Sequence, residues 1–306
     1  MRRRKTGITT GLIATVGLVG WFWVTLVDTP PQPSVSDLPY GKDQAQRFDV
    51  WRPEGKGPFP VVLAVHGGGF AFGDKRGHDG LAEDIAVLRA HGIAVASTNY
   101  RTSDQAPFPA AAQDVTAALA ELHRQAPSLG LDPNHIALWG KSAGANLALL
   151  VGLAAGRRPI GDGMATPVVG IIAMYPPIRF DVMDAQLRNS ACGDKAAVHD
   201  AAESFESKWL GAPLQSRPDL VAQASPLTYV SANSPPVLVQ AGSADCMVPH
   251  KQSIMLADAM RKAGAPVRID ILPGAKHIDA VFDEPENLRV VVSFLKKIFA
   301  MRATGA

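Results

Sequence analysis

Short apolar runs of strand length alternate with longer helix-like segments along most of this chain of 306 residues. Residues 61–65 (VVLAV) and 93–97 (IAVAS) are typical of strands buried on both faces, and residues 81–89 between them fit a helix. Further predicted strands are 135–139, 168–174, 236–241 and 267–272, and further predicted helices are 109–124, 143–154, 249–263 and 286–300. Because strands that alternate with helices usually pair in parallel, the sequence predicts an α/β fold with a mostly parallel central sheet flanked by helices.

The alternation stops between Tyr175 and Pro235, where the sequence is polar and interrupted by prolines. We therefore predict a small insertion over residues 176–235 that caps one end of the sheet. Ahead of the first strand the chain is rich in proline, and proline restricts the backbone to extended forms. Residues 29–39 are thus predicted to be a stiff linker, and residues 40–306 to be the folded domain that contains the cap.

The first residues of the chain have the character of a membrane anchor. Four basic residues, Arg2 to Lys5, precede residues 7–27, which contain no charged side chain. As a helix, those 21 residues would span about 31 Å, close to the ~30 Å hydrocarbon core of a bilayer. We predict that residues 1–28 form a transmembrane anchor and that the basic start keeps the rest of the chain outside the cytoplasm, in the periplasm or the extracellular space. A cleaved signal peptide, which would give a secreted protein, is the alternative, although its apolar run is usually shorter.

Charge and cysteine content limit the other partners. The formal net charge is +2, and the basic residues form no long stripe interleaved with aromatic residues, so no nucleic-acid partner is expected. The sequence has no Cys-x-x-Cys or His-x-x-x-His pair, so no metal site is expected. The two cysteines, Cys192 and Cys246, could form a disulfide in an oxidising compartment or remain two buried thiols. A disulfide would tie the predicted cap to the chain beside Asp245.

Residues 136–150 (IALWGKSAGANLALL) place a serine between a predicted strand and a predicted helix. Gly140, Lys141 and Ser142 could end a phosphate-binding loop, but that motif requires a glycine at position 135, where the chain has His135. The same residues fit the Gly-x-Ser-x-Gly turn, in which glycines leave room for a tight turn that lifts the serine hydroxyl above the sheet. The following helix N-terminus favours negative charge, as on an oxyanion. The pattern predicts that Ser142 is a nucleophile.

A serine hydroxyl needs a base and an orienting carboxylate, and in this arrangement they follow in the order Ser, Asp, His. Asp245 comes shortly after the strand at 236–241, and His277 comes shortly after the strand at 267–272. Because the carboxyl ends of parallel strands meet at one edge of the sheet, these two side chains are predicted to converge on Ser142. Asp279 or Asp283 is the fallback for the acid. His250, only five residues after Asp245, is a weaker base on this reasoning.

A glycine-rich loop is predicted to hold the negative charge of the reaction. The sequence His66-Gly67-Gly68-Gly69 directly follows the strand at 61–65, so its backbone amides are free of side chains that would block a ligand. We predict that the amides of Gly67, Gly68 and Ala143 form an oxyanion hole.

From about residue 40 to its end the chain resembles the α/β-hydrolases of the lipase and esterase type, especially the hormone-sensitive-lipase-like branch and its acetyl-xylan/feruloyl-esterase-like relatives. The matching stretches are 46–53 (QRFDVWRP), 66–70 (HGGGF) with 73–75 (GDK), 99–101 (NYR), 108–109 (FP) with Asp114, the turn at 140–144, Asp245 with 248–249 (VP), and 274–277 (GAKH). The resemblance implies an α/β-hydrolase fold and hydrolysis of carboxylic esters without a cofactor. Ser142 would attack, His277 would transfer the proton, Asp245 would orient His277, and water would release the acyl group.

The expected substrate is a small-molecule ester with a short acyl chain, carbohydrate-linked esters included. The sequence departs from the family at Lys141, where relatives more often have an acidic, amide or aromatic residue, and in the cap, which matches nothing in the family. An amide or formamide hydrolase of the same fold is the close alternative, because the same groups attack either carbonyl. A non-catalytic binding protein of this fold is the distant alternative. The sequence predicts no oligomeric state.

Overall fold

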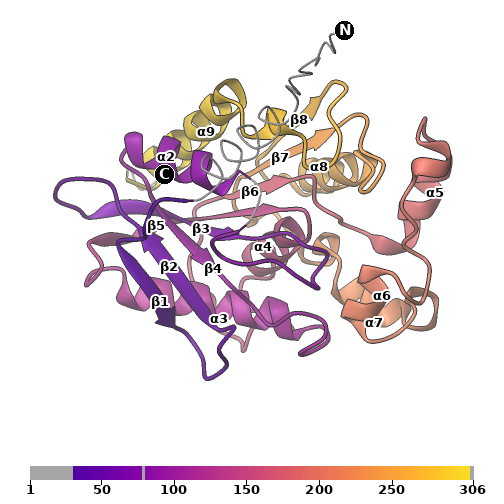
Figure 1. Cartoon of the computed structure of the whole chain (residues 1–306), viewed down its shortest axis with the longest axis horizontal. Helices are drawn as coiled ribbons and strands as arrows, with labels where there is room; N and C mark the ends of the chain where they lie inside the picture. The colour runs from indigo at the N-terminus through magenta and orange to yellow at the C-terminus, as the bar shows by residue number, and fades with distance from the viewer. Residues whose placement is uncertain (1–29, 78–79, 304–306) are drawn as a thin grey trace, which may run out of the picture.

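An eight-stranded sheet forms the centre of the computed structural model of the protein, which describes residues 30–77 and 80–303 (Figure 1). The strands are β1 (Val35–Pro39), β2 (Arg47–Trp51), β3 (Phe59–Val65), β4 (Ala94–Thr98), β5 (Leu131–Lys141), β6 (Ile171–Met174), β7 (Val237–Gly242) and β8 (Val267–Leu272). Their order across the sheet is β1-β2-β4-β3-β5-β6-β7-β8. β2 is antiparallel to both of its neighbours, whereas all pairs from β4 to β8 are parallel. The prediction of a mostly parallel sheet is confirmed.

Long helices cover both faces of this sheet, as the sequence predicts. They are α2 (Leu81–Ala90), α3 (Ala110–Gln125), α4 (Ala143–Ala154), α8 (Lys251–Ala263) and α9 (Pro285–Ala303). Alternate residues of β3 point to opposite faces: Val61 and Leu63 pack in the core that includes α3, α4 and α8, and Val62 packs in the core that includes α2 and α9. Burial on both faces explains why the strand sequences are continuously apolar.

The sheet begins earlier in the sequence than predicted. β1 pairs with β2 at the edge of the sheet, although its residues fall within the range 29–39 that was predicted to be a linker, and neither strand was foreseen. The indole N–H of Trp51 donates to the carbonyl oxygen of Pro31 at 2.5 Å, and the Arg52 N–H donates to the Ser34 hydroxyl at 3.0 Å. The prediction of a linker up to residue 39 is therefore wrong, because an edge strand tolerates neighbouring prolines whose missing N–H groups the sheet does not need.

The residues between β6 and β7 form short helices, which Figure 1 shows as a group at one end of the molecule. They are α5 (Met183–Arg188), α6 (Phe205–Leu210) and α7 (Pro218–Gln223), with 3-10 turns at Phe180–Val182, Gly193–Lys195, Leu214–Ser216 and Pro226–Tyr229. This cap is less polar than its sequence suggested. Trp209 is buried, stacks on Phe70 with ring centroids 3.8 Å apart, and meets Phe108 edge to face. An aromatic cluster therefore fastens the cap to the loop after β3.

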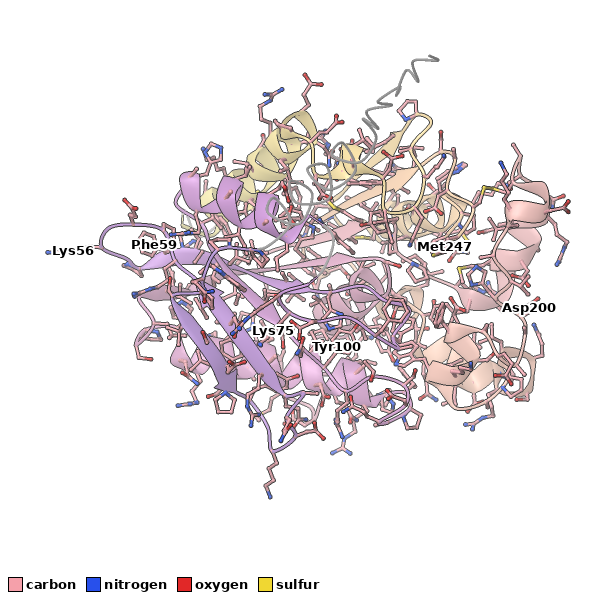
Figure 2. All side chains as sticks on the ribbon, in the orientation of Figure 1. Lys56, Phe59, Lys75, Tyr100, Asp200 and Met247 are labelled. Carbon is pink, nitrogen blue, oxygen red and sulfur yellow. A yellow bond between two sulfur atoms is a disulfide. The ribbon has the colours of Figure 1, made fainter. Side chains whose placement is uncertain are left out.

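A disulfide between Cys192 and Cys246 joins the cap to the loop after β7. Two hydrogen bonds accompany it: the Ala197 N–H donates to the Cys246 carbonyl oxygen at 2.8 Å, and the His199 ring lies 2.8 Å from the Met247 carbonyl oxygen. Figure 2 shows Met247 between the sheet and the cap helices. The cap is thus tied covalently to the segment that contains Asp245.

A buried group of three charged side chains lies at the end of β5. The Lys141 ammonium nitrogen is 3.0 Å from Asp84 Oδ2 and 2.5 Å from Asp283 Oδ1, so it joins β5 to α2 and to the turn at the start of α9. Burial would lower the pKa of Lys141, but the two carboxylates raise it above its ordinary value. Burial raises the pKa of Asp84 to about 7, although Lys141 opposes the rise. The charge at the unusual position 141 is therefore balanced inside the protein.

Within the described part of the chain, none of the helices combines the length and the apolar character needed to cross a bilayer. The predicted anchor at residues 1–28 lies outside the described residues.

Replacing both Cys192 and Cys246 with serine should lower the free energy of unfolding by about 4 kcal/mol, because the disulfide closes a loop of 54 residues in the unfolded chain. Urea unfolding of the oxidised wild type and of the double variant would measure the difference. The wild type unfolded with a reductant should match the variant. Identical unfolding of the wild type with and without reductant would contradict the prediction.

Replacing Lys141 with methionine should destabilise the fold by about 3–5 kcal/mol, because it leaves two buried carboxylates without a counter-ion. The loss should be greater at pH 8 than at pH 5, since acid neutralises a buried carboxyl whose pKa is raised. Urea unfolding at both pH values measures it. Lys208→Met is the matched control, because the Lys208–Glu203 pair is exposed and should contribute at most about 1 kcal/mol. Equal losses in the two variants would contradict a structural role for the buried group.

Candidate active site

Ser142 occupies a sharp turn between β5 and α4. Its backbone angles are φ 53° and ψ −123°, a conformation that costs free energy for any residue with a side chain. The flanking glycines are required by space: a Cβ on Gly140 would lie 2.1 Å from the Gly144 carbonyl oxygen, and a Cβ on Gly144 would lie 2.1 Å from the Val65 carbonyl oxygen. The predicted strand, turn and helix are therefore present, and the turn packs directly against the end of β3.

The Ser142 hydroxyl is the first member of a chain of hydrogen bonds. Its Oγ lies 2.9 Å from His277 Nε2, and His277 Nδ1 lies 2.7 Å from Asp245 Oδ2. The three residues come from the carboxyl ends of β5, β8 and β7. Because an ionised carboxylate only accepts hydrogen bonds, Nδ1 carries the ring proton, and Nε2 is left to accept the hydroxyl proton of Ser142. This arrangement can prepare a serine oxygen for attack on a carbonyl carbon.

The carboxylate of Asp245 is fixed on its other side. Asp245 Oδ1 accepts hydrogen bonds from the backbone N–H groups of Met247 and Val248, both at 2.8 Å, and the side chain is fully buried. The ring of Tyr175 meets the His277 ring edge to face, with centroids 4.7 Å apart. Tyr175 was not foreseen, although it directly follows β6 at the same edge of the sheet and the rule used for Asp245 and His277 would have found it.

The fallback acids have other partners. Asp279 accepts hydrogen bonds from the backbone N–H groups of Lys276 and Val281, and Asp283 pairs with Lys141. Among the other histidines, His250 lies at the start of α8, and His78 falls outside the described residues.

The glycine loop lies against the serine turn. A Cβ on Gly67 would lie 3.3 Å from Ser142 Cβ, and Gly68 has φ +103°, where a Cβ would lie 2.1 Å from the Phe72 carbonyl oxygen. Position 68 therefore requires glycine, and at position 67 a side chain would press against the serine turn. Ala143, the third predicted oxyanion residue, begins α4 beside Ser142, and all three of these residues line the same cavity as Ser142 and His277.

His66 supports this loop from behind. Its ring stacks on Tyr100, with centroids 4.3 Å apart, and its Nδ1 donates to the Gly67 carbonyl oxygen at 2.8 Å. The Tyr100 hydroxyl donates to the His66 carbonyl oxygen at 3.0 Å. Burial lowers the pKa of His66 to about 4, so the ring is neutral at physiological pH. His66 therefore shapes the loop and adds no charge to it.

A cavity of about 500 Å³ opens above Ser142. Its walls come from the glycine loop, the serine turn, the loops that contain Asp245 and His277, and the cap segment 197–206. The cap therefore contributes directly to the cavity, although its sequence gave no matching residues from which this could be predicted.

His199 and Glu206 form a buried pair in the cap side of this wall. His199 Nδ1 lies 2.9 Å from Glu206 Oε1, and His199 Nε2 lies 2.8 Å from the Met247 carbonyl oxygen. Burial would lower the pKa of His199, but the Glu206 carboxylate raises it above its ordinary value. His199 lies in an irregular segment and Glu206 lies in the first turn of α6, seven positions later, so no sequence pattern indicated the pair.

Among the residues that the structure describes, no group of three or more His, Cys, Asp or Glu side chains is arranged to hold a metal ion.

Comparison with known proteins agrees with this fold. Esterase LipC of Mycobacterium tuberculosis is 30% identical over 278 residues, which cover 87% of this chain and 66% of LipC. The ethyl acetate hydrolase of Pseudomonas putida is 29% identical over 249 residues, which cover 78% of this chain and 73% of that protein. The chain thus spans just under two thirds of the length of LipC.

Among solved structures, a truncated carbohydrate esterase from gut microbiota superposes with a TM-score of 0.76 at 23% identity, covering 88% of this chain and 99% of that one. At this identity the likeness establishes the α/β-hydrolase fold alone. The model of the BD-FAE family matches residues 48–260. Because this match spans more than half of the 306 residues, the chain belongs to the BD-FAE family of α/β-hydrolases.

Proposed function

We propose that this protein is a serine esterase that hydrolyses carboxylic esters of small molecules. The observation that carries the proposal is the unbroken series of hydrogen bonds from Ser142 through His277 to Asp245, beside a glycine loop and beneath an open cavity. The names of the relatives, an esterase and an ethyl acetate hydrolase, support the same reaction.

In the first half of the reaction, Ser142 Oγ attacks the carbonyl carbon of the ester, and its proton passes to His277 Nε2. Asp245 stabilises the resulting imidazolium ion. The carbonyl oxygen becomes negatively charged, and the backbone N–H groups of Gly67, Gly68 and Ala143 stabilise that charge. The carbon–oxygen bond to the alcohol then breaks, and the alcohol leaves with the proton from His277. The acyl group remains on Ser142.

In the second half, His277 accepts a proton from a water molecule, and the resulting hydroxide attacks the acyl carbon. The second oxyanion occupies the same hole. When it collapses, Ser142 Oγ leaves with the proton from His277, and the carboxylic acid is released. No cofactor takes part in these steps.

We infer that the preferred acyl groups are short. The relative from Pseudomonas putida is named for ethyl acetate, the ester of a two-carbon acid, which supports this choice. The carbohydrate esterase is only 23% identical and bears on the fold alone. The preferred alcohol half of the ester must therefore be inferred from the side chains that line this cavity.

We also infer that residues 1–28 anchor the protein in a membrane, with the remainder of the chain outside the cytoplasm. The uncharged stretch 7–27 behind a basic cluster supports the anchor, and the Cys192–Cys246 disulfide supports an oxidising compartment. Pro31, at the start of the described residues, accepts a hydrogen bond from Trp51. Trp51 pairs with Val95 near the amino end of β4, so the described chain starts toward the amino ends of the parallel strands. An anchor there would leave the cavity, at the carboxyl ends, open to solution.

Replacing Ser142 with alanine should lower kcat for p-nitrophenyl acetate by about 10⁵-fold, because the nucleophile is lost while the fold is kept. The measurement is the initial rate at saturating ester, with the melting temperature as a check of folding. Ser128→Ala, at a surface turn, is the matched control and should keep full activity. Activity retained in Ser142→Ala would refute the mechanism. Faster cleavage of a matched aryl formamide by the wild type would favour the amidase alternative.

The anchor predicts that the full chain remains with the membrane fraction after extraction with alkaline carbonate. Protease should digest the catalytic part in cells whose outer layer has been opened but whose cytoplasmic membrane is intact, because the proposed location of this part is outside the cytoplasm. Fractionation followed by immunoblotting measures both. A soluble protein whose mature N-terminus lies beyond residue 28 would contradict the anchor and indicate a cleaved signal.

A further inference from the structure

Exposed apolar side chains gather around the mouth of the cavity. Eight large apolar side chains are exposed in the described part of the chain, and five of them line this one cavity. Those five are Phe72, Val198, Phe205, Met247 and Ile278. They come from separate segments: the loop after β3, the cap, and the loops that follow β7 and β8. Packing of the fold does not fully account for them, since each is between 46% and 64% exposed.

Such convergence marks a binding surface. Contact with water costs about 25 cal/mol per Å² of apolar surface, and a cluster of such side chains in a concave site normally contacts a ligand. Single exposed apolar residues would be scattered over the molecule. Here they encircle the entrance to Ser142.

Phe72 and Phe205 form the part of this rim that lies closest to the glycine loop. Phe72 is 59% exposed and Phe205 is 46% exposed, and their rings meet edge to face with centroids 5.8 Å apart. Phe205 also rests on Gly69, where a Cβ would lie 2.7 Å from its ring. The aromatic pair therefore stands beside the oxyanion loop, next to the position of the ester carbonyl in the proposed mechanism, and offers faces and edges to an apolar group.

The buried polar side chains of the cavity wall already have interaction partners within the protein. The buried and half-buried polar side chains of the described lining have partners within the protein: Ser142 with His277 at 2.9 Å, His199 with Glu206 at 2.9 Å, Ser204 with the Ser207 N–H at 3.1 Å, and Lys141 with Asp283 at 2.5 Å. Glu203 is exposed and pairs with Lys208 at 3.2 Å. A sugar displays several hydroxyl groups, and a site that selects it needs polar groups aimed at them. The buried polar groups of this wall are already engaged with other groups of the protein.

We propose that the cavity selects esters that carry an aryl or other bulky apolar group, held by Phe72 and Phe205, and that it discriminates against esters of carbohydrates. The proposal rests on the esterase function proposed above and names its substrate class. Because the acyl groups proposed above are short, we assign the apolar group to the alcohol half of the ester. An apolar acid half, which the same two rings could also contact, is the other arm of the test.

The test compares esters of similar intrinsic reactivity. Benzyl acetate against ethyl acetate examines the alcohol half, methyl 3-phenylpropanoate against methyl propanoate examines the acid half, and a methyl xyloside monoacetate represents the carbohydrate esters. Values of kcat/KM are measured for the full-length wild type, Phe72→Ala and Phe205→Ala. Ile254→Ala is the matched control, because Ile254 is an exposed apolar residue of α8 that does not line the cavity.

The wild type should prefer at least one phenyl ester over the xyloside monoacetate by about tenfold or more, the size expected from burial and aromatic contact of one ring. Phe72→Ala and Phe205→Ala should each lower kcat/KM for that phenyl ester by about tenfold, and for its small counterpart by less than about threefold. Ile254→Ala should change neither. A preference for the xyloside monoacetate, or equal losses on phenyl and small esters, would overturn the proposal.

Binding separates this proposal from the esterase function itself. Ser142→Ala leaves the ester intact, so calorimetry can measure the Kd of benzyl acetate, methyl 3-phenylpropanoate and the xyloside monoacetate. A phenyl ester should bind more tightly than the sugar ester, and adding Phe72→Ala should raise its Kd by about tenfold. If the wild type hydrolyses no ester, the proposed function fails while these affinities still decide the selectivity. Equal affinities for phenyl and sugar esters would refute it.

Discussion

The contact between the serine turn and the end of β3 is the constraint on which the rest of the site depends. Gly144 passes so close to the Val65 carbonyl oxygen that any side chain there would overlap it. Beside this contact Ser142 adopts a positive φ of 53°, and the glycine loop lies against its side chain. The parallel sheet then supplies Asp245 and His277 from strands farther along the same edge. Local strain at one residue is thus maintained by the packing of the whole sheet.

The cap is part of the site and is held by three different kinds of interaction. The disulfide to Cys246 and the hydrogen bond from His199 to Met247 attach it on the side of the Asp245 loop. The stacking of Trp209 on Phe70 attaches it on the side of the glycine loop. Since both attachments end within a few residues of the reacting groups, the shape of the cavity and the geometry of the proposed reaction are set by the same contacts.

The sequence predicted the parallel sheet, its flanking helices and the convergence of Ser142, Asp245 and His277, because these follow from local pattern and from the order of strands. It missed β1 and β2, since antiparallel edge strands beside prolines lack the apolar run of a buried strand. It could not predict which side chains surround the cavity. His199 and Phe72 lie in irregular segments and meet Glu206 and Phe205 at the start of α6. The partners of Lys141 lie 57 positions before it and 142 positions after it (141 − 84 and 283 − 141). Such pairings depend on tertiary packing, which carries no periodic signal along the chain.

The absence of a side chain at Gly69 allows the loop after β3 and the helix α6 to approach each other closely. Phe205 occupies the space that a Cβ at this position would take. A methyl group there would displace the Phe205 ring and change the shape of the entrance above the nucleophile. The residue at position 69 and the residue at position 205 therefore set the width of the entrance together, so a change at one of them alters what the other can be.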